Sequence, residues 1–199
     1  MMIMLIKVIN SFVKQDKRYA FSYSQKHWSA LAHIEGFLGQ FGGWNIVEPT
    51  DACIIGIWKN TDSYRSFMND VHDDIFYKNG QKASYDKLET TLSSNGQFVK
   101  GIYHHTRSSI VGANYMMITS ISHNNHDKSL IPFTLISERD RCLSTFVFAD
   151  EHTSTFISLF GYAPPDATKH VLQKNKIPVQ QQNIYKLEKE WTVLQTFSS

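Results

Sequence analysis

The sequence predicts an α+β protein built from two tandem halves, the second a much altered copy of the first. Over residues 1–92, apolar runs and amphipathic stretches alternate in the order β-α-β-β-α-β. Two segments of the later half align with segments of the first. The length of 199 residues suits either one large domain or two small ones.

The first strand and the first helix are predicted over residues 3–32. Residues 3–10 (IMLIKVIN) are apolar and partly β-branched, which is typical of a strand. From residue 14 to residue 32, large apolar side chains recur at helical spacing opposite a polar side. Gly36 is expected to end this helix.

The next two runs predict an antiparallel hairpin. Residues 37–45 (FLGQFGGWN) and 52–58 (ACIIGIW) flank the turn residues EPTD. The glycines of residues 39–43 follow a helix and lead along a strand, whereas a phosphate-binding loop runs from strand to helix. They are therefore expected to be strand bends or close contacts within the sheet.

A second helix and a fourth strand complete the first half. Asp62 or Ser63 is expected to cap the helix, whose apolar stripe runs from residue 64 to residue 75. Residues 85–92 (YDKLETTL) alternate and predict a strand. The β-α-β-β-α-β order is the ferredoxin-like motif, with both helices on one face of an antiparallel sheet. The other face needs cover, which is usually a second sheet.

The second half supplies that sheet as an altered repeat. Residues 53–67 (CIIGIWKNTDSYRSF) align without gaps to residues 142–156 (CLSTFVFADEHTSTF), which predicts a strand, an acidic turn and a helix with a stripe through Phe156 and Phe160. Met4–Ile9 has a counterpart in Met116–Ile121.

The spacing of these matches indicates what has changed in the second copy. Its first helix is expected to be missing or cut to a turn around residues 123–130. Both halves close similarly, with KLE at residues 87–89 and at residues 186–188. We therefore expect a first domain over residues 1–92, a junction over residues 93–114 and the degenerate second half over residues 115–199.

Composition excludes several classes of function. The net charge of +2 is too balanced for a nucleic-acid-binding or membrane-surface protein. Cys53 and Cys142 both lie in apolar runs and predict two buried free thiols rather than a disulfide. The sequence shows no secretory signal and no apolar run long enough to span a membrane, so a cytoplasmic protein is expected.

Several strings resemble a known family. The strings GFLGQ (residues 36–40) and IWKN (residues 57–60) resemble antibiotic-biosynthesis-monooxygenase-like proteins. That resemblance implies ferredoxin-like units that pair sheet to sheet as dimeric α/β barrels. The longer strings WSALAHIEGFLGQFGGW (residues 28–44) and FMNDVHDDIFYKNGQ (residues 67–81) resemble the bacterial YdbC-like branch, which joins two such units and has no firmly assigned activity.

Two classes within this superfamily imply different chemistry. The haem-degrading members use an Asn, a Trp and a His, and this sequence has Asn10 but Phe67 and Tyr77 at the other two positions. Haem degradation is therefore not favoured. The cofactor-free quinone-forming oxygenases oxidise electron-rich phenols in an aromatic pocket, and the resemblance extends to them without a shared short motif.

His72 is the first candidate for catalysis. It lies on the edge of the apolar stripe of the second helix, where a half-buried imidazole can serve as a general base near neutral pH. The alternative is a histidine that is packed and hydrogen-bonded for structural reasons.

Aromatic residues could form a ligand cavity shared with His72. Stacked rings and histidines would hold a flat aromatic molecule. The alternative is ordinary core packing of these rings. The candidate substrate-binding residues are Tyr23, His27, Trp28, Trp44 and Phe67.

No metal or other cofactor is expected. His104, His105, His123, His126 and Asp127 lie in predicted loops and lack the ligand spacing of a structural zinc site.

The sequence thus favours a cofactor-independent, monooxygenase-like protein that acts on or binds a small aromatic or quinol-like molecule. A non-catalytic binding or stress-response protein on the same scaffold is the alternative, and a purely structural role for the second half also remains open. Two assemblies are compatible with the sequence: pairing of the two halves within one chain as a pseudo-dimer, and a homodimer of the chain.

Overall fold

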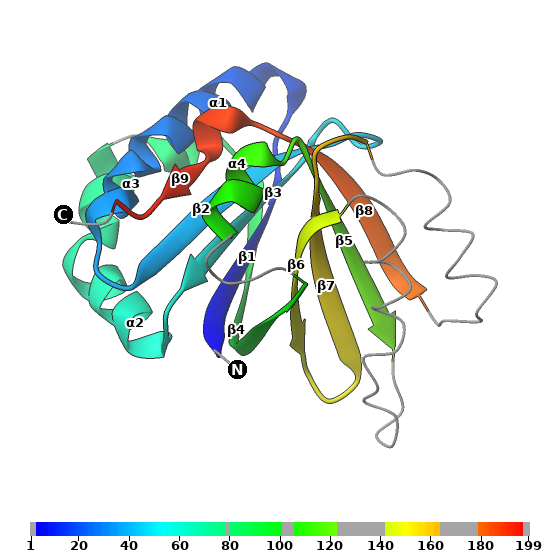
Figure 1. Ribbon diagram of the computed structural model, residues 1–199. Coiled ribbons are helices and arrows are strands. Elements are labelled where there is room, and N and C mark those ends of the chain that lie inside the picture. The colour runs from blue at the N-terminus through cyan, green and yellow to red at the C-terminus, as the bar shows by residue number, and fades with distance from the viewer. Residues whose placement is uncertain (1–2, 79, 101–105, 123–141, 164–178, 197–199) are drawn as a thin grey trace. The chain divides into compact units, whose positions relative to one another are not determined.

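The computed structural model describes residues 3–78, 80–100, 106–122, 142–163 and 179–196 (Figure 1). The chain divides into two compact units. The first unit comprises residues 3–95 and 185–199, and the second comprises residues 96–184. Residues 185–199 therefore group with the first unit, whereas the sequence assigned them to the second half.

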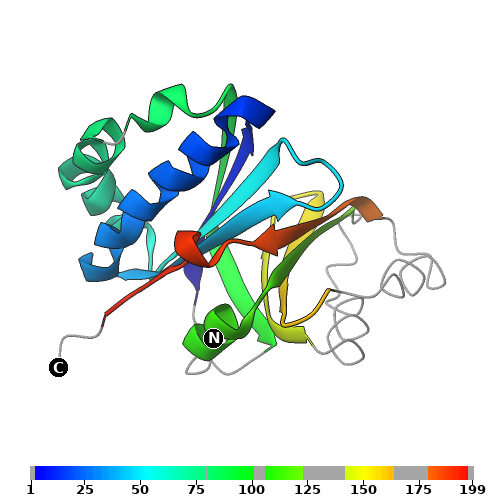
Figure 2. The same cartoon turned by 90° about the horizontal axis from the view of Figure 1, so that it is seen from above.

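The first unit has the predicted β-α-β-β-α-β order. Its strands are hydrogen-bonded neighbours in the order β4-β1-β3-β2, and helices α1 to α3 lie on one face of the sheet (Figures 1 and 2). The α+β class is confirmed. Its elements are β1 Met4–Phe12, η1 Gln15–Lys17, α1 Arg18–Gln25, η2 Lys26–His33, β2 Phe37–Asn45, β3 Asp51–Trp58, α2 Thr61–Asp70, α3 His72–Lys78, η3 Gln81–Ala83 and β4 Lys87–Lys100.

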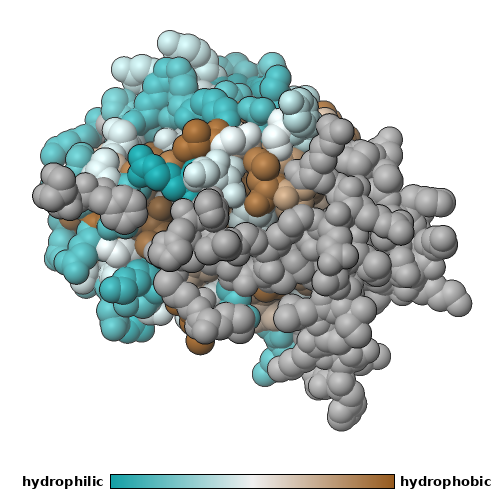
Figure 3. All heavy atoms as spheres, in the orientation of Figure 1, coloured by the Kyte–Doolittle hydropathy of each residue, from teal (hydrophilic) through white to brown (hydrophobic). Residues whose placement is uncertain are grey.

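The helices bury the stripes that the sequence predicts. Phe21, Trp28 and Leu31 are buried, and the long first helix continues from α1 into the 3-10 helix η2. The face of these helices that is visible in Figure 3 is mainly hydrophilic. The first helical stretch is therefore amphipathic, with its apolar side toward the sheet.

The cap of α2 differs from the prediction. Asn60, rather than Asp62 or Ser63, is the N-cap, and its Oδ1 accepts a hydrogen bond of 2.9 Å from the backbone N–H of Ser63. Asn60 precedes the first helical residue in an extended conformation, which is the backbone geometry that a capping side chain requires. The helix begins at Thr61 and ends at Asp70, and α3 follows after Val71.

The glycines of β2 permit close backbone contacts, as predicted. A Cβ atom at Gly42 would collide with the carbonyl oxygen of Cys53, and one at Gly43 would collide with the backbone of Lys186. Gly36 has a φ of 74°, which favours glycine after the first helix.

The end of the chain completes the first unit. The last residues of β8 (Val179–Leu187) and the short strand β9 (Val193–Leu194) both pair with β2. Between them, the 3-10 helix η5 (Lys189–Trp191) places Trp191 fully buried against Trp44 and Phe21.

The second unit contains a related sheet. Its strands β5 (Tyr115–Ser122), β6 (Cys142–Ala149), β7 (Thr153–Phe160) and β8 are neighbours in the order β8-β5-β7-β6, which is the strand order of the first unit. The predicted counterpart of Met4–Ile9, Met116–Ile121, lies in β5 as expected. The junction contains the end of β4 and the helix α4 (Thr106–Gly112).

The predicted second helix of this copy is wrong at residues 153–160. These residues form strand β7, which pairs with β6 across a turn where Asp150 Oδ1 accepts from the backbone N–H groups of His152 and Thr153. Residues 156–160 are buried on both faces of the strand. The resulting continuous apolar run also contains residues at helical spacing, which is why the sequence predicted a helix there. Residues 142–149 correspond in strand order to β2, not to β3.

The two KLE strings do not occupy equivalent positions. The string begins β4 in the first unit but lies at the end of β8 in the second, so the two matches occupy opposite ends of their strands. The proposed loss of a helix near residues 123–130 lies outside the described residues.

Both cysteines are buried and free, as predicted. In the described part of the chain, no helix is long and apolar enough to cross a membrane.

Candidate functional site

A cavity of about 340 Å³ lies within the first unit, between the sheet and its helices. This volume is at the lower end of the range of small-molecule sites. Its walls are rich in aromatic rings from both layers. Among them are Phe21, Trp28, Trp58, Tyr64, Phe67 and Phe76.

The floor of the cavity is a row of residues across three strands. Lys7 on β1 and Gln40 on β2 both lie opposite Gly56 on β3 in the strand register. A Cβ atom at Gly56 would meet Trp58 Nε1 at 3.7 Å and Lys7 Cβ at 3.8 Å, which are ordinary contacts. The missing side chain of Gly56 therefore leaves open space between Lys7 and Gln40.

Trp28 lies in the helical wall. Its indole N–H donates to Oε1 of Gln81 at 2.8 Å, and its ring centroid lies 6.4 Å from that of Phe67 and 5.7 Å from that of His72. Two elements far apart in sequence, η2 and η3, are thus joined at the cavity by a buried hydrogen bond.

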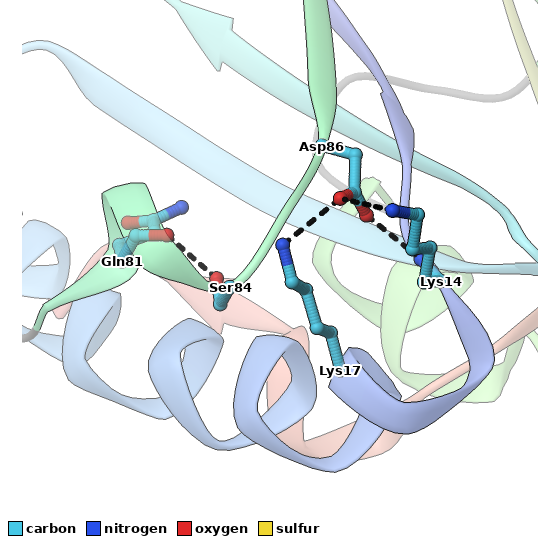
Figure 4. A network of polar contacts seen from close by, with 5 residues as sticks. All are labelled: Lys14, Lys17, Gln81, Ser84 and Asp86. Atoms are coloured by element: carbon cyan, nitrogen blue, oxygen red, sulfur yellow. Dashed lines mark hydrogen bonds and ion pairs between the residues drawn. The ribbon is translucent and has the colours of Figure 1, made fainter.

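A polar network holds the segment that carries Gln81 (Figure 4). Ser84 Oγ donates to the carbonyl oxygen of Gln81 at 2.7 Å. Asp86 accepts a hydrogen bond of 2.9 Å from Lys17 Nζ and one of 3.1 Å from the backbone N–H of Lys14. The hydrogen bonds from Lys17 and then Lys14 keep the pKa of Asp86 below its ordinary value.

His72 also lines the cavity, at the start of α3. Its side chain is 19% exposed, and Nδ1 lies 2.9 Å from Oδ1 of Asp73. Its ring stacks on Phe76 with centroids 5.6 Å apart. If Nδ1 donates its hydrogen to the carboxylate, Nε2 carries the lone pair and can accept a proton.

Lys7 is a cavity residue that sequence reasoning missed. Burial lowers the pKa of Lys7 from 10.5 to about 8, and Nζ lies 5.3 Å from the ring centroid of Tyr64. Among the described residues, no carboxylate pairs with it and no hydrogen bond reaches it. A lysine in the middle of an apolar strand was the signal that could have identified it.

Ser11 is a second polar residue of the cavity floor. It lies on the same face of β1 as Lys7 and is 2% exposed. Among the buried side-chain polar atoms of the described residues, Ser11 Oγ is the one without a hydrogen-bond partner. Buried hydroxyl groups are nearly always satisfied, so a partner supplied by a ligand would explain this group.

The structure brings together three of the candidate residues, because Trp28, Phe67 and His72 all line the cavity. Tyr23, His27 and Trp44 are not among the lining residues. Tyr23 is 52% exposed and lies edge-on to His27 at 5.2 Å. Trp44 instead packs in a buried cluster, with the Arg18 guanidinium 4.2 Å from its ring centroid.

Only some of the residues considered for metal or haem chemistry lie within the described ranges. Within the described ranges, no group of three or more His, Cys, Asp or Glu side chains is placed to hold a metal ion. The histidines at positions 104, 105, 123 and 126 lie outside those ranges. Asn10 alternates with the cavity residues of β1 and is not part of the cavity lining, and Tyr77 is 69% exposed.

Sequence comparison relates the chain to a family whose reaction is not assigned. Residues 5–93 match the family model described as "Domain of unknown function (DUF4937)". The chain is 40% identical over 104 residues to the uncharacterized protein YdbC of Bacillus subtilis strain 168, and this alignment covers 51% of the chain and 87% of YdbC. The predicted resemblance to the YdbC-like branch is confirmed.

Structural comparison extends the likeness over nearly the whole chain. A proposed monooxygenase from Fusobacterium nucleatum superposes with a TM-score of 0.67 at 13% identity, over 96% of this chain and 94% of that one. A proposed monooxygenase from Lactobacillus acidophilus gives a TM-score of 0.62 at 14% identity, over 97% of each chain. At these identities the likeness establishes a shared fold.

Proposed function

Because the chain belongs to the YdbC-like family with the domain of unknown function DUF4937, we propose a function from its cavity: binding and cofactor-independent oxidation of a small electron-rich phenol or quinol. The observation that carries this proposal is the cavity of about 340 Å³ between aromatic walls. Such walls suit a flat ring, and the few polar groups that line them can orient its oxygen atoms.

The chemistry needs a base and dioxygen. A phenol that loses its proton becomes an electron donor, and 1-naphthol plus one O₂ gives 1,4-naphthoquinone plus one H₂O. One oxygen atom enters the ring, and the other leaves as water with the two hydrogens that the phenol loses. His72 is the proposed base, because Asp73 can hold the hydrogen on its Nδ1.

The fold supports this proposal in part. Two structures with the same fold are described as proposed monooxygenases. Since one fold serves many functions, the residues of the cavity and not the likeness must decide the activity. A non-catalytic role in binding the same class of molecule is the alternative, and the test below separates the two.

The test measures binding and oxygen consumption with 1-naphthol. We expect binding to quench tryptophan fluorescence, because Trp28 and Trp58 line the cavity. The substitution Gly56→Leu should abolish binding by filling the cavity, whereas Gly56→Ala adds only a Cβ with room for it and should retain binding. The substitution His72→Gln should stop oxygen consumption while binding persists.

Each outcome has a distinct meaning. Binding without oxygen consumption by the wild type would establish the non-catalytic alternative. Failure of 1-naphthol to bind, or equal binding by the Gly56→Leu variant, would overturn the proposal that this cavity is the ligand site.

A further inference from the structure

The cavity contains one lysine and no acid. Among its lining residues, Lys7 is the only lysine or arginine, and no aspartate or glutamate is present. The other titratable groups that line the cavity are Tyr64 on α2, His72 on α3 and Tyr85, which precedes β4. None of these supplies a negative charge at neutral pH.

The position of Lys7 makes its positive charge unfavourable for the stability of the folded protein. The strand β1 holds its backbone in the floor of the sheet, so its side chain extends over Gly56 into an aromatic surrounding. Its Nζ lies over the face of the Tyr64 ring, 5.3 Å from the ring centroid. Lys7 is half-buried, and a partly desolvated cation without a carboxylate beside it is stabilised when an anion joins it.

A second group lies farther along the same strand. Ser11 is four residues from Lys7 on the same face, which corresponds to about 13 Å between their Cα atoms. Its Oγ is buried and has no partner, as described above. The two groups therefore suit opposite ends of one elongated molecule rather than a single small ion.

We propose that the cavity binds a hydroxylated aromatic carboxylate, with its carboxylate on the Lys7 ammonium and its hydroxyl group on Ser11 Oγ. This inference rests on the proposed function and specifies its substrate class. The aromatic ring would lie between the rings of the walls, above Gly56. The phenolic hydroxyl group would then lie at the end of the molecule farthest from Lys7.

The test compares matched ligands by isothermal titration calorimetry at pH 7. The probes are 6-hydroxy-2-naphthoate, 2-naphthoate without the hydroxyl group, and 2-naphthol without the carboxylate. We expect 6-hydroxy-2-naphthoate to bind wild type about tenfold more tightly than 2-naphthol, because a charge-assisted hydrogen bond is worth about that factor or more.

Variants identify the groups responsible. The substitution Lys7→Met should reduce the ratio of the affinities for 6-hydroxy-2-naphthoate and 2-naphthol to about one. The substitution Lys7→Arg should retain the wild-type ratio. The substitution Ser11→Ala should weaken binding of 6-hydroxy-2-naphthoate relative to 2-naphthoate. Circular dichroism and melting temperature check that each variant is folded.

The pH dependence gives an independent readout. Burial lowers the pKa of Lys7 to about 8, so the affinity of wild type for 2-naphthoate should fall as the pH rises above that value. The Lys7→Arg variant keeps its charge and should not show this fall, whereas the other groups that face the cavity, Tyr64, His72 and Tyr85, are the same in both proteins.

The outcomes separate this inference from the proposed function. If 2-naphthol binds and 6-hydroxy-2-naphthoate binds no more tightly, the assignment of the carboxylate to Lys7 is overturned while the aromatic site stands. If Lys7→Met keeps the preference, the carboxylate lies elsewhere and the inference is also overturned. If no probe binds, both proposals fail.

Discussion

The indole N–H of Trp28 donates a hydrogen bond of 2.8 Å to Oε1 of Gln81, and both side chains are buried in the cavity wall. Replacement of Gln81 by Met removes the acceptor and leaves a buried donor unsatisfied. We expect the free energy of unfolding to fall by about 1–3 kcal/mol in urea titrations. The control is the same change in a Trp28→Phe background, where the loss should be smaller. An equal loss in both backgrounds would contradict this role for the hydrogen bond.

Lys7 should make stability rise at alkaline pH. A lysine whose pKa is lowered by folding destabilises the folded state while it is charged, so the cost is present below pH 8 and is relieved between about 8 and 10.5. At pH 7 the Lys7→Met variant should therefore be more stable than wild type, by about 3 kcal/mol at most. The difference should shrink as the pH rises through this range. Urea unfolding at several pH values measures it, and a constant difference would show that Lys7 is solvated.

Asp86 should make stability depend on acidic pH. Its pKa is lowered in the folded protein, so its contribution is present above the ordinary value of 3.8 and is lost as the pH falls through the lowered value. The substitution Asp86→Asn should lower the melting temperature at pH 7, and its effect should shrink as the pH falls through the lowered pKa and the carboxyl becomes protonated. The control Asp62→Asn changes an exposed carboxylate whose ion pair with Arg65 is 3.8 Å long, and it should have little effect.

Asn60 should contribute to the stability of α2, which carries Tyr64 and Phe67 into the cavity wall. The substitution Asn60→Ala removes the side chain that accepts from the Ser63 N–H, and it should cost about 1 kcal/mol in thermal or urea unfolding. The matched substitution Ser63→Ala, at one of the caps expected from sequence, should change stability by less than about 0.5 kcal/mol. The reverse order of the two effects would mean that Ser63 is the cap.

The first unit was largely predictable from sequence because the spacing of apolar residues changes clearly between its strands and its helices. The change from the strand at residues 3–10 to the helical spacing that follows, and the turn EPTD between two apolar runs, are strong local signals. The second unit lacks such contrast. Residues 142–149 and 153–160 are both apolar strands, and a buried strand has no period that distinguishes it from a short buried helix.

The candidate site was predictable in part for a related reason. Helical spacing identified Trp28, Phe67 and His72, because they share the buried stripes that face the sheet. It could not tell that Tyr23 lies on the exposed side of α1 or that Trp44 packs on Trp191. Lys7 and Ser11 were missed because a strand face becomes a cavity floor only when a neighbouring strand offers Gly56, and sequence does not reveal the register.

The placement of Trp191 affects how the protein can be divided for experiments. A fragment that ends at residue 95 would match the family model at residues 5–93 but would lose the strands that pair with β2 and the ring that covers Trp44 and Phe21. Such a fragment would present an open strand edge beside uncovered aromatic rings, which is a template for self-association. We therefore expect the final segment of the chain to limit self-association of the first unit.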